Sequence, residues 1–288
     1  MTAHCFCGTG EREIAASTRP GTVKRVISRL DSVWTAPAPA GDRHEATLRG
    51  LRAVAWPLAV LLVFHRVFVL ARAGHATDDF TTVWSAARRF VERVPVYSEI
   101  YEHVDPHYLY NPGATLLLSP LGLLPSVDAA RPFFVLFNAL CIIAALAWLT
   151  RLSGHSLSHP VFPAALALAF LTEAVTNTLV FSNINGVLLL ALVAFIALSM
   201  SEKNVAAGVV LGLAVVVKPM FAPLLVLPLM RLRWASVAAG IAVPVLLNLV
   251  AWPLTPGARD YIDVVVPYLG ITRDYANSSL AGFAVYFG

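Results

Sequence analysis

Residues 53–73, AVAWPLAVLLVFHRVFVLARA, form an apolar run that decides the fold class of this chain. The run has about the 20 residues that an α-helix needs to cross a lipid bilayer. Two polar side chains, His65 and Arg66, lie inside it. Because intramembrane charges face protein or water rather than lipid, we expect this helix to pack against others. The run therefore predicts the first span of a helical membrane protein.

The composition agrees with a membrane protein. Of the 288 residues, 58% are hydrophobic and 13% are charged, and the mean hydropathy is +0.71. A soluble domain carries about 25% charged residues. The net charge of +4 does not indicate nucleic-acid binding, because the basic residues cluster beside apolar runs, where they set membrane orientation. The three cysteines are too few for a disulfide framework, and no nearby His/Cys cluster makes Cys5 and Cys7 a metal site.

Further apolar runs predict an all-α polytopic membrane domain over residues 51–288. The run 113–125 is short and contains two prolines, so we interpret it as a re-entrant or outer-leaflet segment. The other candidate spans are 133–149, 161–181, 187–200, 205–217, 220–230 and 235–253. Residues 1–50 are polar and rich in proline, alanine and arginine, and we expect them to form a disordered cytoplasmic tail.

Basic residues predict the orientation of these spans. The many arginines and lysines that precede the first span place the N-terminus in the cytoplasm. If residues 113–125 do not cross, alternation puts five stretches on the outer face: 74–111, Arg131, 176–185, Lys218 and the chain after Pro253. Arg131 is then the exception to the positive-inside rule. The unusual polar residues converge on this outer side.

The outer loop predicts an amphipathic helix over residues 80–94. Its apolar stripe comprises Phe80, Val83, Trp84, Ala87, Phe90, Val91 and Val94. Such a helix would lie in the plane of the membrane interface, with Arg88 and Arg89 able to hold a phosphate by paired hydrogen bonds. Asp78 and Asp79 precede it. One alternative is that Asp78 caps the helix and Asp79 adds to the negative charge that a helix N-terminus favours. This alternative explains Asp78 well but explains the presence of both carboxylates less well.

Other polar residues interrupt apolar sequence on the same side. They are His107, Tyr108, Tyr110, Asn177, Asn183, Asn185 and Lys218. Glu173 also interrupts apolar sequence, and its depth depends on whether residues 113–125 cross. Aromatic anchoring, hydrogen bonds between helices and a snorkelling lysine are the alternatives for single members. A lone lysine on the outer side nevertheless favours a bound anion. Because no nucleotide-binding or hydrolase motif is present, a sugar donor would have to come from the lipid phase.

Several separated motifs resemble the GT-C membrane glycosyltransferases of glycosyltransferase family 87. They are DDFTTVWSAARRF (78–90), HYLYNPGATLLLSPLGLLP (107–125), TEAVTNTLVFSNING (172–186), Lys218-Pro219 and TRDYANSS (272–279). The last three narrow the resemblance to the arabinan-branching arabinofuranosyltransferases of mycobacteria and related actinobacteria, over residues 51–288. The family's Tyr-Pro-Pro is Tyr110-Asn111-Pro112 here, and the family continues with more spans beyond Gly288.

The resemblance implies an inverting transfer of arabinofuranose from decaprenyl-phosphate arabinose to arabinan, which makes α-(1→3) branches in arabinogalactan and lipoarabinomannan. It implies that Asp79 is the catalytic base, assisted by Asp78. Lys218, with Arg88 or Arg89, is expected to bind the departing phosphate, because these residues are positively charged and are predicted to lie on the same side of the membrane as Asp79. The candidate sugar-binding residues are Trp84, His107, Tyr108, Tyr110, Asn183, Asn185, Arg273 and Asn277. The scheme needs no metal or other cofactor, and its partners are the lipid-linked donor, the polysaccharide acceptor and membrane lipids.

Three alternatives stay open at this point. A mannosyltransferase that uses polyprenyl-phosphate mannose would share the Asp loop. A transporter or lipid flippase could use the same intramembrane polar groups, although the second half of the chain holds no counterpart of the Asp-rich loop. The third alternative is an inactive membrane scaffold.

Overall fold

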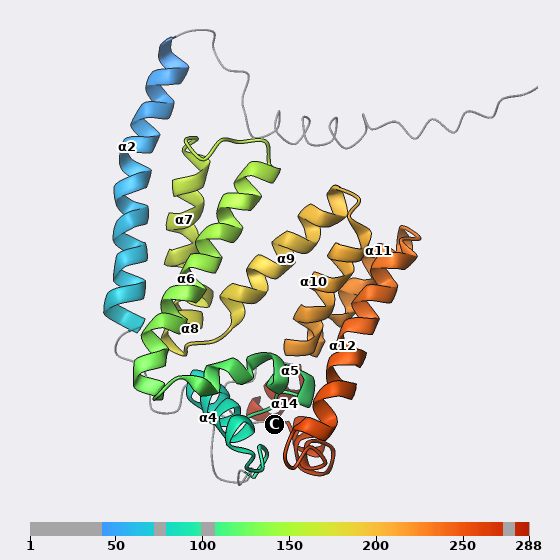
Figure 1. Ribbon diagram of the computed structural model, residues 1–288. Coiled ribbons are helices and arrows are strands. Elements are labelled where there is room, and N and C mark those ends of the chain that lie inside the picture. The colour runs from blue at the N-terminus through green and yellow to red at the C-terminus, as the bar shows by residue number, and fades with distance from the viewer. Residues whose placement is uncertain (1–41, 72–78, 99–106, 273–279, 288) are drawn as a thin grey trace, which may run out of the picture. The chain divides into compact units, whose positions relative to one another are not determined.

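The computed structural model describes residues 42–71, 79–98, 107–272 and 280–287. The chain divides into two units, residues 1–44 and 45–288. Apart from residues 42–44, which start the first helix, the helices discussed below belong to the second unit. Every element in the described part is a helix (Figure 1). The predicted residues Asp78, Arg273 and Asn277 and the predicted tail up to residue 41 lie outside the described part.

Three helices are long and apolar enough to cross a membrane within the described part of the chain. They are Glu45–Leu70, which combines α2 (Asp42–Phe64) with the π-helix η1 (His65–Leu70), then α6 (Val127–Leu152) and α12 (Trp234–Leu254). A fourth candidate is the pair α7 (Val161–Leu171) and α8 (Glu173–Val180), which bends by 65° between them. The prediction of an all-α membrane fold with some broken spans is therefore confirmed.

The first span begins earlier than the sequence analysis placed it. Helix α2 starts at Asp42 and the candidate span starts at Glu45, so residues 42–50 are helical instead of belonging to a disordered tail. The polarity of these residues does not end a helix, because alanine, leucine, glutamate and arginine are good helix formers. Inside the span, the Nε atom of Arg66 donates a 3.1 Å hydrogen bond to the carbonyl of Phe170 on α7. The expected packing against another helix is thus found.

The remaining helices are short. They are α4 (Asp79–Glu92), α5 (Pro112–Leu118), η2 (Ser119–Leu123), α9 (Asn185–Met200), α10 (Asn204–Val217), η3 (Pro219–Leu225), α11 (Val226–Met230), η4 (Tyr261–Val265), α13 (Val266–Leu269) and α14 (Leu280–Phe287). Helices α5 and η2 together cover only residues 112–123. At 1.5 Å per residue this is about 18 Å, well below the thickness of a bilayer core. Their length agrees with the prediction of a segment that does not cross.

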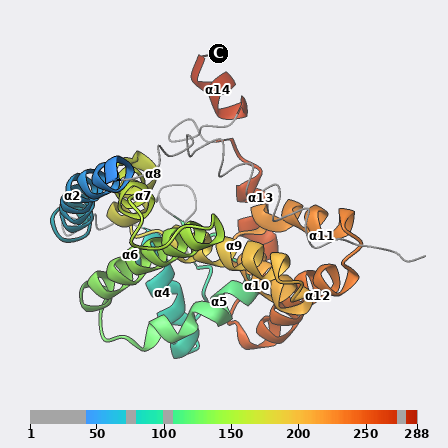
Figure 2. The ribbon, with the colours of Figure 1, turned by 90° about the horizontal axis from the view of Figure 1, so that it is seen from above.

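The polar segments gather at one end of the helices. Helices α4 (Asp79–Glu92), α5 and α8 lie at the end where α9 begins and α10 finishes (Figure 1). The turns at 153–160, 201–203 and 231–233 lie at the opposite end. Seen from above, α9 and α10 lie between α6 and α12 (Figure 2), and α10 packs against both α9 and α12. The predicted convergence of the polar segments on one side is present in the fold.

Helix α4 differs from its prediction in what covers its apolar face. Its buried side chains are Phe80, Val83, Ala86, Ala87 and Phe90. They pack against η2, α5 and α6 instead of lying on a lipid interface. Periodicity alone does not distinguish these two partners, because both accept the same apolar stripe. The contact is close: a Cβ on Gly122 of η2 would lie 2.4 Å from the Ala87 carbonyl.

Candidate active site

Asp79 is the first residue of α4, and its main chain is tied to a turn between α8 and α9. The Asp79 amide donates a 3.0 Å hydrogen bond to the carbonyl of Phe181. The side-chain amide of Asn183, two residues later in the same turn, donates a hydrogen bond to the Asp79 carboxylate. A helix N-terminus also favours a negative charge. These contacts hold the predicted base in place at the polar end of the helices.

Asn183 connects Asp79 to Lys218. The Nζ atom of Lys218 donates to the Oδ1 atom of Asn183 at 3.2 Å and to the Oδ1 atom of Asn185 at 2.7 Å. Lys218 follows the last residue of α10 and precedes a proline that starts η3. The two contacts of Asn183 require its nitrogen to face the carboxylate and its oxygen to face the ammonium group. A carboxylate, an amide and a cation therefore form one hydrogen-bonded chain.

The surroundings of Lys218 lower its affinity for a proton. Burial lowers the pKa of Lys218, and the Asp79 carboxylate opposes this effect. Lys218 lies between α10 and η3, outside the candidate spans. A partly desolvated ammonium group with two amide partners is suited to hold an anion at this point.

Two cavities meet at the Asp79–Asn183 pair. The first, of about 400 Å³, is lined by Asp79, Thr82, His107, Tyr110, Asn183 and Lys218, among others, and we call it the aromatic cavity. The His107 ring packs edge-on against Tyr268, with 4.8 Å between ring centroids. Burial, and secondarily Asp79, raises the pKa of the Tyr110 phenol. Tyr110 therefore stays a neutral hydrogen-bonding group beside the carboxylate.

The second cavity is larger and lies toward α8. Its volume is about 690 Å³, and its polar lining comes from Asp79, Asn177, Thr178, Asn183 and Asn185. We call it the asparagine cleft. Its apolar walls come from α6, α8 and α9. Asp79 and Asn183 line both cavities, whereas Lys218 lines only the aromatic cavity.

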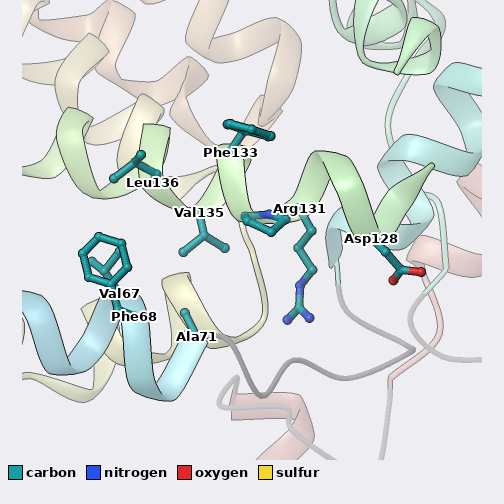
Figure 3. A pocket seen from close by; sticks show the side chains of 9 residues that line it. Val67, Phe68, Ala71, Asp128, Arg131, Phe133, Val135 and Leu136 are labelled. Carbon is teal, nitrogen blue, oxygen red and sulfur yellow. The ribbon is translucent and has the colours of Figure 1, made fainter. Parts of the chain in front are cut away.

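Arg131 stabilises the turn that carries Asn183. Its Nε atom donates to the hydroxyl of Ser182 at 2.9 Å, and its Nη2 atom donates to the carbonyl of Val180 at 3.0 Å. Ser182 has a φ of 50°, a conformation that most side chains avoid. Arg131 also lines a third cavity, between η1 and α6, alongside the apolar side chains of Val67 and Phe133 (Figure 3). Arg131 thus has structural partners in the turn.

The structure does not bring every predicted residue into these cavities. Arg88 pairs with Glu92, and the Nη1 atom of Arg89 donates to the Val96 carbonyl at 3.5 Å. Neither arginine, nor Trp84, lines the aromatic cavity or the asparagine cleft. The buried hydroxyl of Tyr108 lies 2.8 Å from that of Thr115, so this tyrosine belongs to the protein interior. Arg88 and Arg89 point away from the cavities because of the way α4 packs. Sequence spacing does not reveal this direction.

Two asparagines that support the site were not singled out from the sequence. The Oδ1 atom of Asn138, on α6, accepts a 3.1 Å hydrogen bond from the amide of Gly186 at the start of α9. Asn111 caps α5 through a 3.0 Å bond from the Ala114 amide. The sequence contained a signal for both residues. Asn138 is an amide inside an apolar run, and Asn111 directly precedes a proline, a pattern typical of the start of a helix.

Comparisons with known proteins identify the family of the chain. The model of glycosyltransferase family 87 matches residues 108–288. The chain is 56% identical over 254 residues to an alpha-(1->3)-arabinofuranosyltransferase of Corynebacterium glutamicum. The aligned region covers 88% of this chain and 60% of the relative. Proteins with the same name from Mycolicibacterium smegmatis and Mycobacterium tuberculosis are 44% and 42% identical, over 84% and 91% of this chain and 57% and 63% of the relatives.

The chain thus spans about 60% of the length of these curated relatives. No solved structure gives a significant match. The family match covers more than half of the chain, and the apolar helices are those of a membrane protein. The chain is therefore an integral membrane protein that belongs to glycosyltransferase family 87.

Proposed function

We propose that the chain transfers arabinofuranose from a polyprenyl-phosphate donor, decaprenyl-phosphate arabinose, to an arabinan chain and forms an α-(1→3) branch with inversion. The observation that carries this proposal is the link from the Asp79 carboxylate through Asn183 to the Lys218 ammonium group at the wall of one cavity. The names of the relatives support the sugar and the linkage. The arabinan of arabinogalactan and lipoarabinomannan is the proposed acceptor.

The proposed reaction begins with the acceptor hydroxyl beside Asp79. Its oxygen attacks the anomeric carbon of the donor while the Asp79 carboxylate takes the hydroxyl proton. The bond between the anomeric carbon and the phosphate oxygen breaks, and its electron pair leaves with the polyprenyl phosphate. Removal of the proton by a positioned base contributes about 10²–10⁴-fold to the rate. Attack from the side opposite the phosphate inverts the configuration of the anomeric carbon.

Lys218 has the second role in this scheme. Negative charge develops on the phosphate oxygen as it departs, and a preorganised cation at that point lowers the energy of the transition state. Hydrogen bonds to Asn183 and Asn185 hold Lys218 in place. His107 and Tyr110, which line the same cavity, are proposed to contact the transferred sugar.

The proposed reaction needs neither a metal nor another cofactor. Its site would face the outer side of the plasma membrane, with the N-terminus in the cytoplasm. The basic residues that precede the first span support this orientation. Asp79 at the start of α4, Asn183 in the turn before α9 and Lys218 after α10 then lie on the outer side, where a lipid-linked sugar and a polysaccharide can meet.

The test uses the purified chain in liposomes with a synthetic arabinan acceptor. Polyprenyl-phosphate arabinose and polyprenyl-phosphate mannose are offered separately, and the linkage of the product is analysed. We expect arabinose transfer with α-(1→3) linkage, and a loss of about 10²–10⁴-fold in Asp79→Asn. Asp263→Asn is the matched control, because Asp263 pairs with Arg259 away from both cavities.

Three results would contradict this proposal. Transfer of mannose in place of arabinose would assign a different donor. Full activity of Asp79→Asn would show that Asp79 is not the catalytic base. Accumulation of the lipid-linked sugar across the membrane without any transfer would identify a transporter.

A further inference from the structure

The asparagine cleft has a polar wall because the chain bends before α8. Helix α7 ends at Leu171, and Thr172 caps the new helix by accepting a 3.4 Å hydrogen bond from the Val175 amide. The bend of 65° turns α8 away from the direction of α7. On α8, Glu173 and Asn177 are both exposed and face each other one turn apart, with 3.4 Å between the Asn177 nitrogen and a Glu173 oxygen.

The cleft is lined by three carboxamides in addition to the Asp79 carboxylate. Asn183 and Asn185 line it near Lys218, and Asn177 lines it farther along α8. A carboxamide both donates and accepts hydrogen bonds, which suits the hydroxyl groups of a glycan. The volume of about 690 Å³ exceeds that of the aromatic cavity, about 400 Å³. This lining is that of a site for a neutral polyhydroxylated chain.

The charge of the cleft argues against a phosphate-bearing ligand. No lysine, arginine or histidine is among the described residues that line it, and Asp79 contributes a negative charge. The aromatic cavity, by contrast, is lined by Lys218. A phosphate brought into the cleft would meet the Asp79 carboxylate, whereas the nearby Lys218 lines the other cavity and is bonded to the oxygens of Asn183 and Asn185. The two cavities therefore differ in the ligand that their charges accept.

The direction of the reaction gives the same assignment, and this step rests on the function proposed above. In an inverting transfer the acceptor oxygen and the departing phosphate lie on opposite sides of the anomeric carbon. Asp79, which would contact the acceptor, lines both cavities, whereas Lys218, which would contact the phosphate, lines only one. We infer that the asparagine cleft binds the acceptor glycan, with Asn177 as a contact, and that the donor enters the aromatic cavity.

The test measures binding of two probes to the full chain in lipid nanodiscs. One probe is a synthetic arabino-oligosaccharide, and the other is polyprenyl phosphate. Asn177→Ala removes one carboxamide, and Ala174→Trp fills the cleft from an exposed position on α8. Thr176→Ala is the matched control on the same helix, since Thr176 does not line the cleft and its hydroxyl donates to the Thr172 carbonyl.

Asn177→Ala is expected to weaken binding of the oligosaccharide about three- to tenfold, the effect of one lost hydrogen bond, and to leave polyprenyl phosphate unchanged. Ala174→Trp should abolish binding of the oligosaccharide alone. Thr176→Ala should change neither. Weaker binding of polyprenyl phosphate in Asn177→Ala or Ala174→Trp, with normal binding of the oligosaccharide, would overturn the inference. Oligosaccharide binding that follows this pattern without any sugar transfer would support the inference while contradicting the proposed function.

Discussion

The side-chain nitrogen of Asn111 donates a 2.8 Å hydrogen bond to the main-chain oxygen of Val216. This bond joins the start of α5 to the end of α10. Asn111 directly follows Tyr110, and Val216 lies two residues before Lys218. The bond therefore sets the spacing between two side chains that line the aromatic cavity.

Asn111→Ala should destabilise the protein by about 1–3 kcal/mol, because it removes both the cap of α5 and the bond to Val216. Asn111→Ser keeps an oxygen that can cap the helix but does not reach Val216. Thermal unfolding in detergent measures the two changes. If the bond to Val216 matters for the cavity, sugar transfer falls in both variants, although Asn111→Ser is the more stable of the two. Equal activity of Asn111→Ser and the parent would show that the bond does not position Lys218.

Gly122→Ala should displace α4, which carries Asp79. The new Cβ atom would lie 2.4 Å from the main-chain carbon and oxygen of Ala87, a distance that backbone atoms do not tolerate. We expect a clear loss of thermal stability together with a loss of transfer. Gly50→Ala is the control, since a Cβ there has nothing within 4 Å and alanine favours the helix by up to about 1 kcal/mol. A harmless Gly122→Ala would mean that α4 does not pack closely on η2.

The rate of transfer should fall at alkaline pH as Lys218 loses its proton. Because burial lowers the pKa of Lys218 below the ordinary value of 10.5, this loss begins at a lower pH than an ordinary lysine would give. Lys218→Arg, which stays charged, should move the alkaline loss to higher pH or remove it. Rates in liposomes measured from pH 7 upward check both profiles. An identical alkaline profile in the two proteins would exclude Lys218 as the titrating group.

Asn183→Ala should lower the rate of transfer by more than about tenfold, because it removes two hydrogen bonds to charged groups. It removes contacts with both Asp79 and Lys218. Asn185→Ala removes one partner of Lys218 but leaves the contact with Asp79, so its effect should be smaller. Single-turnover rates with saturating donor and acceptor separate this effect from weaker binding. Equal losses in the two variants would contradict the bridging role of Asn183.

Local features of the sequence predicted most of the helices. The apolar runs at 133–149 and 235–253 correspond to α6 and α12, because a membrane span is a local property of about 20 consecutive residues. The extra turns at the ends of the helices were missed, since polar helix formers such as those at 42–50 continue a helix past its apolar run. The prediction that the apolar face of α4 lies against lipid was also wrong, because that face packs against other helices. Lipid and protein select the same apolar pattern, so the sequence does not distinguish them.

The sequence by itself determined that this chain is a helical membrane protein, and it singled out Asp79, Asn183, Asn185 and Lys218 as unusual polar residues in apolar surroundings. Only the tertiary structure decided that these four form one hydrogen-bonded chain, whereas Arg88 and Arg89 bind other parts of the protein. The physical reason is that helix formation and hydrophobicity depend on neighbouring residues. The direction of a side chain and the partner that it meets depend on how distant helices pack.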